Sequence, residues 1–164
     1  MKTPESQLLF AYGTLRSAHP EHLQCFANVL SVQRAFIPGE LWTLKEGYPL
    51  LVIDPKRCLR KAGIDSRADW SWGLETFRTS DRTSLSEGPL VEGELIELIS
   101  GNAALAEADR WEGYEYGRPS VYQRYLSHVQ LADGSSSLSW IYGAYAAPAG
   151  AMRFSGSRWP SPLG

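Results

Sequence analysis

The sequence predicts an α+β fold, a small mixed and mainly antiparallel β-barrel flanked by short helices. About seven predicted elements follow one another along the chain, and most of them are strands while two are helices. The strands are short and several glycines lie among them, which favours a sheet that curls into a barrel. A chain of 164 residues has the usual length of one domain, so we expect a single domain over residues 1–164.

The predicted strands are apolar segments rich in β-branched and aromatic residues. The first runs from Leu8 to Tyr12 and ends at a glycine, as a buried strand often does before a turn. Further strands are predicted at residues 35–44, 48–53 and 91–98. Residues 121–131 and 138–146 form a predicted hairpin, because the segment between them reads "ADGSSS".

Two segments have helical patterns. The first begins at Pro20, a residue that suits the first turn of a helix, and extends to about Leu30. Its apolar residues recur at helical spacing, namely Leu23, Phe26, Ala27 and Leu30. The second, "NAALAEADRWE" at residues 102–112, is rich in alanine and is expected to end at Gly113.

The segment from Asp54 to Pro89 has a different composition, with scattered charges, many Ser and Thr, and isolated apolar residues. We interpret it as a long surface excursion outside the barrel, because the domain continues on both sides of it. Trp70 and Trp72 are not both expected to be exposed in so polar a segment. One of them should cover the mouth of a cavity or another apolar surface.

The composition gives no indication of a nucleic acid or an anionic membrane as partner. The 16 basic and 18 acidic residues leave a formal charge of −2 and are spread along the chain. Two cysteines are too few for a disulfide framework, and the polar start "MKTPESQ" lacks the apolar core of a signal peptide. We therefore expect a cytoplasmic location; the sequence does not indicate an oligomeric state.

His19, His22 and Cys25 are spaced three residues apart, so a helix would place them along one side. All three are possible zinc ligands, but no fourth ligand follows at a recognisable spacing. Two surface histidines and a core cysteine are the favoured interpretation, and no metal site is predicted. The chain also lacks the G-x-S-x-G pattern of hydrolases and both common phosphate-loop patterns.

Glu112 is the first candidate for a functional residue. On the predicted helix it shares a face with Leu105 and Ala108, and it is the last residue before the glycine stop. Burial and the negative end of the helix dipole would both raise the pKa of its carboxyl, as suits a group that exchanges protons near neutral pH. The alternative is a solvent-facing glutamate in a fraying last turn.

The second candidate is the loop Tyr12-Gly13-Thr14-Leu15 at the end of the first strand. Gly13 can adopt a positive φ and allow a ligand to approach the backbone, and successive N–H groups after a strand can bind an anion. The alternative is a tight turn with no ligand. Arg16 is either a solvated charge or the partner of a carboxylate.

Five segments together resemble the γ-glutamylcyclotransferase-like family, which includes γ-glutamylamine cyclotransferases and plant avirulence-induced proteins. They are "LLFAYGTLR", "GYPLLV", "VEGELIEL", "ALAEADRWEGYE" and "VYQRYL…WIYGAY", and their order and spacing match from Leu8 to about Tyr145. The Y-G-T-L pattern and the helix-end D-x-x-E-G-Y pattern are specific as a pair. "FSGSRW" near the C-terminus is similar to a family tail pattern.

The resemblance implies a barrel with a cavity at one end, where Tyr12, Gly13, Thr14 and Leu15 bind the γ-glutamyl group of a small-molecule substrate. It implies that Glu112 is the catalytic acid/base. We expect this carboxyl to be the only one there able to transfer the proton, and changes at Asp109 or Glu115 to matter far less, since either can be solvated without affecting the reaction. The α-amine of the substrate would attack its own γ-carbonyl and release 5-oxoproline and an amine, with no cofactor.

We therefore expect a cyclotransferase acting on a γ-glutamyl amine or a γ-glutamyl amino acid. The alternatives are a non-catalytic small-molecule-binding protein on the same fold and a deacylase of a γ-glutamylated biosynthetic intermediate. Two departures from the family pattern concern the substrate rather than the reaction type. They are the length of the 54–89 segment and the bulky Trp111 beside Glu112.

Overall fold

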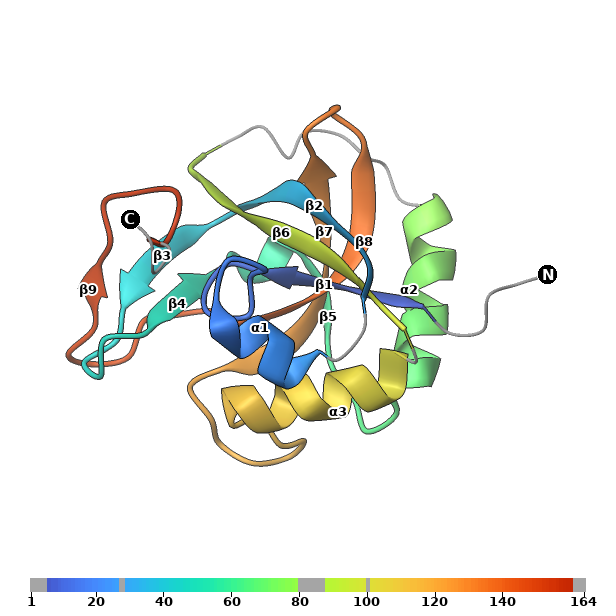
Figure 1. Ribbon diagram of the computed structural model, residues 1–164, viewed down its shortest axis with the longest axis horizontal. Helices are drawn as coiled ribbons and strands as arrows, with labels where there is room; N and C mark the ends of the chain where they lie inside the picture. Colours follow the sequence, from blue (N-terminus) through green and yellow to red (C-terminus); the bar gives the residue numbers. More distant parts are fainter. Residues whose placement is uncertain (1–5, 27–28, 80–87, 100, 161–164) are drawn as a thin grey trace.

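The computed structural model describes residues 6–26, 29–79, 88–99 and 101–160 (Figure 1). The main sheet contains β1 (Gln7–Ala11), β2 (Val29–Pro38), β5 (Cys58–Lys61), β6 (Leu90–Leu98), β7 (Gln123–Leu131) and β8 (Ser136–Gly143). Their spatial order is β2-β6-β1-β8-β7-β5. β1 and β8 are parallel, and the other neighbours are antiparallel.

The sheet curls until two strands that are far apart in this order meet. β2 pairs with β6 along its length and also with β7, where Ala35 is opposite Leu131 and Phe36 is opposite Gln130. This second pairing closes the sheet into a small barrel. The prediction of an α+β fold with a curled, mainly antiparallel sheet is confirmed.

A second, three-stranded sheet lies beside the barrel, on the left in Figure 1. It consists of β3 (Glu40–Thr43), β4 (Pro49–Val52) and β9 (Met152–Arg153), in the order β4-β3-β9. Residues 35–44, predicted as strand, are divided at Gly39 between β2 and β3. The predicted hairpin is confirmed as the antiparallel pair β7 and β8.

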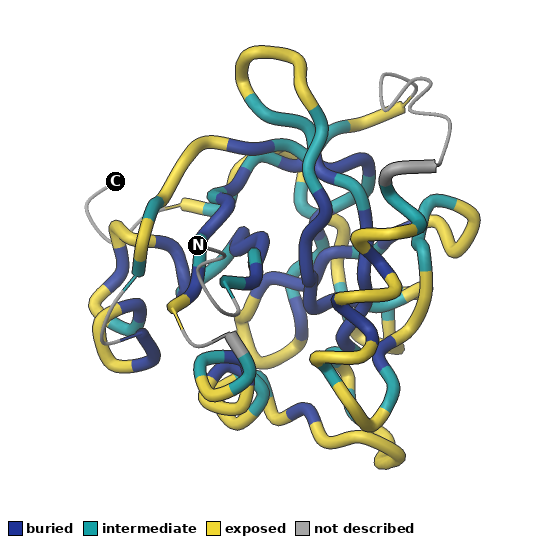
Figure 2. Tube along the Cα trace, turned by 90° about the vertical axis from the view of Figure 1, so that its right-hand side faces the viewer, coloured by how far each residue is buried: buried dark blue, intermediate teal, exposed yellow. Residues whose placement is uncertain are grey.

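Successive residues of β1 face two different parts of the core. Leu9 and Ala11 belong to an outer cluster that also contains the buried apolar residues of the helices. Phe10 and Tyr12 belong to an inner cluster formed with residues of the surrounding strands. This alternation follows from the two-residue period of a strand. Figure 2 shows buried segments mainly in the interior of the molecule and exposed segments mainly in its peripheral loops.

Within the described residues, the sheet is accompanied by the 3-10 helix η1 (Pro55–Arg57) and by three α-helices, α1 (Pro20–Cys25), α2 (Ser66–Thr79) and α3 (Gly101–Glu112). α3 has the predicted position, and it ends where Gly113 adopts a φ of 67°. α1 lies next to α3, below β1 in Figure 1. These two helices and the end of β1 enclose the region described below as the candidate site.

The prediction that the first helix extends to about Leu30 is wrong. The helix ends at Cys25, and Leu30 lies in β2, which begins at Val29 and pairs with β6. Leu23, predicted to face the core, is 76% exposed, whereas His22 and Cys25 are buried. The long-range pairing with β6 therefore overrides the local helical spacing; Ala27 lies outside the described residues.

The prediction that the segment from Asp54 to Pro89 lies outside the barrel is wrong in part. β5 extends the main sheet by pairing with β7, and α2 packs against β8. Trp70 covers an apolar surface, as expected, because its ring is stacked on Trp140 with 6.3 Å between ring centroids. The covered surface belongs to the outer cluster and not to a cavity mouth. Residues 80–87 lie outside the described part of the chain.

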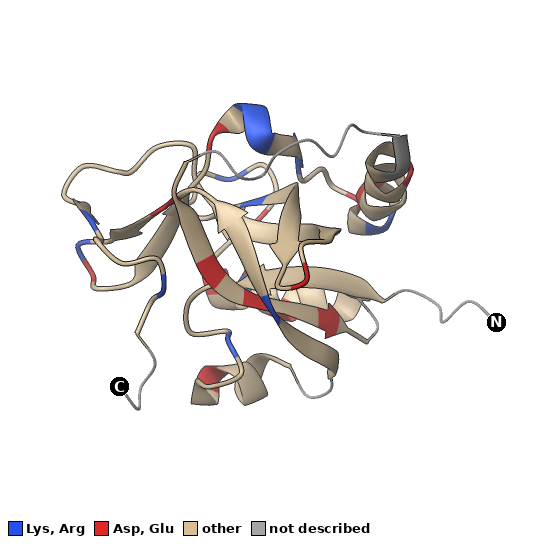
Figure 3. Ribbon diagram, turned by 90° about the horizontal axis from the view of Figure 1, so that it is seen from above, with Lys and Arg blue, Asp and Glu red and all other residues tan. Residues whose placement is uncertain are grey.

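Charged residues of both signs are distributed over many elements in the view of Figure 3, which agrees with the small net charge. None of the helices in the described residues combines the length and the apolar composition that crossing a bilayer requires.

Trp70→Ala tests whether α2 is an integral part of the fold. Trp70 is only 8% exposed, so its removal should lower the free energy of unfolding by about 3 kcal/mol. Trp72, which is 40% exposed with the Arg60 guanidinium over its ring, is the matched control. Trp72→Ala should cost about 1 kcal/mol or less. Equal urea midpoints for the two variants would contradict this role of α2.

Candidate active site

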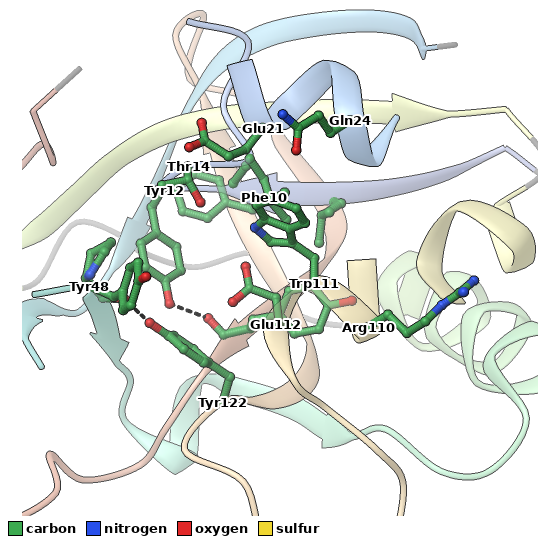
Figure 4. A pocket seen from close by; sticks show the side chains of 16 residues that line it. Phe10, Tyr12, Thr14, Glu21, Gln24, Tyr48, Arg110, Trp111, Glu112 and Tyr122 are labelled. Atoms are coloured by element: carbon green, nitrogen blue, oxygen red, sulfur yellow. Dashed lines mark hydrogen bonds between the residues drawn. The ribbon is translucent and has the colours of Figure 1, made fainter. Parts of the chain in front are cut away.

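A cavity of about 650 Å³ opens beside the C-terminal end of β1. Its wall is formed by the end of β1 and the loop after it, by α1, by the end of α3 and by the start of β4 (Figure 4). The wall includes Tyr12, Gly13, Thr14, Leu15 and Glu112, so the structure brings together all the site residues predicted from the sequence. Residues far apart in the chain thus meet at one cavity.

The loop after β1 is held by hydrogen bonds from three directions. The Arg16 N–H donates to the Gly13 carbonyl at 3.2 Å and closes a turn. The Ser17 N–H and hydroxyl donate to the Glu94 carboxylate of β6, each at 2.8 Å. Nδ1 of His22 in α1 donates to the Leu15 carbonyl at 2.7 Å. These contacts fix the loop that follows Tyr12 against the barrel and against α1.

Gly13 is required for a different reason from the one we predicted. Its φ is not among the positive values found at other glycines of the chain. A Cβ on Gly13 would instead lie 2.9 Å from Cγ of Pro49, closer than van der Waals contact allows. The N–H groups of Gly13, Thr14 and Leu15 donate no hydrogen bond to another described residue. They are therefore available to a ligand in the cavity.

Glu112 is half-buried at the end of α3 and its carboxyl points into the cavity (Figure 4). Burial raises the pKa of this carboxyl to about 7. The carbonyl end of α3 disfavours a negative charge at the same place. The carboxyl can therefore hold or release a proton near neutral pH.

Three tyrosines surround this carboxyl, and their hydroxyls already have protein partners. The Tyr12 hydroxyl donates to the Tyr142 carbonyl at 2.8 Å and accepts from the Leu51 N–H at 3.1 Å. The Tyr122 hydroxyl donates to the Pro49 carbonyl at 2.6 Å (Figure 4). Tyr142 is the third of these tyrosines. Burial raises the pKa of the phenols of Tyr12, Tyr122 and Tyr142, so all three stay protonated near neutral pH.

Asp109, three residues before Glu112 on α3, is bound within the fold. Its carboxylate accepts from Nη1 of Arg124 at 2.6 and 2.5 Å and from the Tyr142 hydroxyl at 2.7 Å. Arg124 is buried between the rings of Tyr114 and Trp140. The ion pair ties the last turn of α3 to β7 and β8, and the aspartate therefore has a structural position.

A second carboxylate, which the sequence did not indicate, lies in the cavity wall. Glu21 reaches the cavity from α1 near Thr14, away from Glu112 (Figure 4). Glu112 is therefore not alone among carboxyls at the cavity, and which of the two transfers the proton stays a prediction. Further lining residues that sequence reasoning missed are Gln24, Tyr48, Arg110 and Tyr122. Their sequence positions alone do not indicate a common cavity, because the fold brings them together from α1, α3 and two loops.

Trp111, the residue that departs from the family pattern, lies on the cavity wall and is 43% exposed. It contributes a large aromatic surface near the mouth of the cavity.

His19, His22 and Cys25 do not converge on a common point. The interpretation of the two histidines as surface residues is wrong, because both are buried. His19 contacts Arg16, His22 donates to the Leu15 carbonyl, and Cys25 belongs to the outer core cluster. The described part of the chain contains no group of three or more His, Cys, Asp or Glu side chains arranged to hold a metal ion.

Asp109→Asn should destabilise the protein, because it leaves the buried Arg124 guanidinium without its charge partner. We expect a loss of about 3 kcal/mol in the free energy of unfolding, measured with urea. Glu115→Gln is the control, because Glu115 is exposed and pairs with the exposed Arg118. It should change stability by about 0.5 kcal/mol or less. Equal stabilities of the two variants would show that the Asp109–Arg124 pair has no structural role.

Comparisons with known proteins concern the fold and the N-terminal part of the sequence. No curated protein sequence matches the chain. YkqA from Bacillus subtilis is similar in structure with a TM-score of 0.56 and 17% sequence identity, which shows a shared fold. The match covers 94% of this chain but only 40% of that one, so this chain spans less than half the length of YkqA. An uncharacterized protein from Pyrococcus horikoshii has a TM-score of 0.45 and 18% identity, over 91% of this chain and 86% of that one.

One family model matches the sequence directly. It describes AIG2-like gamma-glutamyl cyclotransferases and matches residues 9–63, which include the second half of β1, the loop after it and α1. Glu112 lies outside the matched residues. The match confirms the resemblance of this chain to the γ-glutamylcyclotransferase-like family.

Proposed function

We propose that this protein is a γ-glutamyl cyclotransferase that releases 5-oxoproline and a free amine from a small γ-glutamyl amine or γ-glutamyl amino acid. The observation that carries the proposal is the position of Glu112. A carboxyl whose pKa is raised to about 7 lies in the same cavity as a loop with three available N–H groups. The family match over residues 9–63 supports the same type of activity.

In the proposed reaction, the N–H groups of Gly13, Thr14 and Leu15 bind negative charge of the substrate. This charge is either its carboxylate or the oxyanion that develops from the γ-carbonyl. The loop is fixed before the substrate binds by its bonds to Glu94 and His22, so little reorganisation is required. Because Gly13 has no side chain, its backbone can lie close to Pro49, and the adjoining cavity stays open.

Glu112 would transfer one proton within the substrate. The ionised carboxylate removes a proton from the α-amine as its nitrogen forms a bond to the γ-carbon. The bond between the γ-carbon and the leaving nitrogen then breaks, and Glu112 returns the proton to that nitrogen. Ring closure requires no second reactant, so the enzyme supplies orientation and a proton acceptor. The three tyrosines are poor candidates for this role, because their hydroxyls are bonded or their phenols stay protonated.

Two alternatives start from the same cavity. A non-catalytic binding protein would use the loop but would not need a carboxyl such as Glu112 to accept a proton. A deacylase of a γ-glutamylated intermediate would admit water to the γ-carbonyl and release free glutamate. Incubation with a panel of γ-glutamyl amines, followed by mass detection, separates the three functions. A cyclotransferase would yield 5-oxoproline, a deacylase would yield free glutamate, and a binding protein would leave the substrate unchanged.

Glu112→Gln should retain substrate binding and lower turnover by about 10² to 10⁴, because the amide keeps the shape but cannot accept the proton. In the wild type, kcat/KM should rise as the pH increases through about 7, as the carboxyl of Glu112 ionises. Glu115→Gln, on the exposed segment after α3, is the matched control and should retain normal turnover. Normal 5-oxoproline release by Glu112→Gln, with a loss in Glu21→Gln instead, would assign the proton transfer to the second carboxylate.

Gly13→Val should reduce kcat/KM in a folded protein. Its Cβ would meet Pro49, and relief of that contact would displace the loop N–H groups from the substrate. Ile64→Val is a suitable comparison, since Ile64 is 84% exposed and lies outside the cavity wall. Both variants should be assayed after their fold is verified by circular dichroism. An unchanged kcat/KM for Gly13→Val would exclude a substrate-binding role for the loop.

A further inference from the structure

Arg16 and the C-terminal segment 154–160 are two features that the proposed reaction does not use directly. Arg16 follows the substrate loop in sequence and is only 1% exposed, so it is not the solvated charge that the sequence allowed. The segment 154–160 contains the whole "FSGSRW" pattern and ends the described chain. The fold brings these two distant parts into contact.

The Arg16 guanidinium bridges the loop and the C-terminal segment. Its Nε donates to the Gly13 carbonyl at 3.1 Å. Its Nη2 donates to the Trp159 carbonyl at 2.6 Å and to the Pro160 carbonyl at 3.3 Å. Nη2 also lies 3.1 Å from Nε2 of His19. Because the guanidinium is planar and rigid, one group fixes the relative positions of the carbonyls on both sides.

No described carboxylate is within ion-pair distance of Arg16, so the carbonyl oxygens are its main partners. Burial lowers the pKa of the guanidinium, as does the nearby Arg158, while Glu94 and Glu92 act in the opposite direction. A buried cation is costly unless hydrogen bonds compensate it. Loss of the Trp159 and Pro160 carbonyls would therefore displace the side chain, and the bond to Gly13 would be lost with it.

The C-terminal segment has its own attachments, so its position is defined independently of Arg16. The Phe154 N–H donates to the Leu41 carbonyl at 2.8 Å, and the Glu92 N–H donates to the Ser157 carbonyl at 2.7 Å. The rings of Phe154 and Trp159 are in contact, with 5.1 Å between centroids, and both pack against the inner core cluster. The segment is thus anchored to β3 and β6 before it reaches the guanidinium.

We propose that Arg16 is a positioning residue that couples the C-terminal segment to the substrate loop. The segment sets the position of the guanidinium, and the guanidinium sets the Gly13 carbonyl and with it the direction of the neighbouring N–H groups. This inference rests on the proposed function, because it assigns substrate binding to those groups. The coupling should affect KM more than kcat, since the loop contacts persist from the bound substrate to the transition state.

A double-mutant cycle tests the coupling. Its members are Arg16→Met, a chain truncated after Arg158, and the combination of both changes. KM and kcat are measured with the γ-glutamyl amide that the wild type converts fastest. Each single change should raise KM by about 10- to 100-fold, because a displaced loop misplaces the substrate. The combination should raise KM no further than the larger single change, because both remove the same bridge.

Two controls separate the bridge from charge and from chain length. Arg158→Met removes an exposed arginine near Arg16, and truncation after Ser161 keeps both peptide carbonyls as acceptors. Both should have KM values close to that of the wild type. Arg16→Lys retains a cation but not the planar fork, and it replaces Arg16→Met if that variant does not fold. It should raise KM in the same direction.

A measurement independent of turnover uses amide hydrogen exchange. The Arg16 and Ser17 N–H groups donate to Gly13 and Glu94 and report the order of the loop. Their exchange should accelerate at least tenfold in Arg16→Met and in the shorter truncation, while core amides of β1 stay protected. Additive effects on KM, or an unchanged loop exchange after truncation, would overturn the coupling. If the wild type converts no γ-glutamyl amide, the proposed function fails, and the exchange result still decides the coupling.

Discussion

Strand β1 is hydrogen-bonded along both edges, and the candidate site depends on this double pairing. It runs antiparallel to β6 and parallel to β8. A shift by one residue would exchange Phe10 and Tyr12, which face the inner cluster, with Leu9 and Ala11, which face the helices. The register is therefore fixed by two cores at once. The end of the strand, and the loop that begins there, have a defined place at the cavity.

Tyr142 connects the loop side of the cavity to the carboxyl side. Its carbonyl accepts from the Tyr12 hydroxyl, and its own hydroxyl donates to Asp109, which lies on α3 shortly before Glu112. β8, which carries Tyr142, is also the parallel neighbour of β1. The distance between loop and carboxyl is thus set through one strand, with the Asp109–Arg124 pair holding the helix end. Such a shared reference is what a proton transfer over a short distance requires.

The sequence predicted what local patterns determine and missed what distant contacts determine. β1, the β7–β8 hairpin and α3 were predictable, because apolar spacing and glycine stops mark them. α1 is short because β2, which follows it, pairs with β6, and β5 joins the sheet because it pairs with β7. No local pattern reveals either pairing. The same holds for the steric role of Gly13, the partner of Asp109 and the presence of Glu21 at the cavity. Each depends on a residue brought near by the fold.

The raised pKa of Glu112 carries an energetic cost that bears on the function. Burial moves the pKa from an ordinary 4.5 to about 7, so the folded state binds this proton more tightly than the unfolded chain does. The associated stability is present below pH 4.5 and is lost as the pH rises through about 7. At higher pH the ionised, partly buried carboxylate destabilises the fold by up to about 3 kcal/mol.

A glutamine at this position would fill the same space without that cost. A pocket that only binds a ligand gains nothing from such a group, whereas a catalyst that must take up and return a proton near neutral pH does. The cost therefore favours the catalytic interpretation over the binding one.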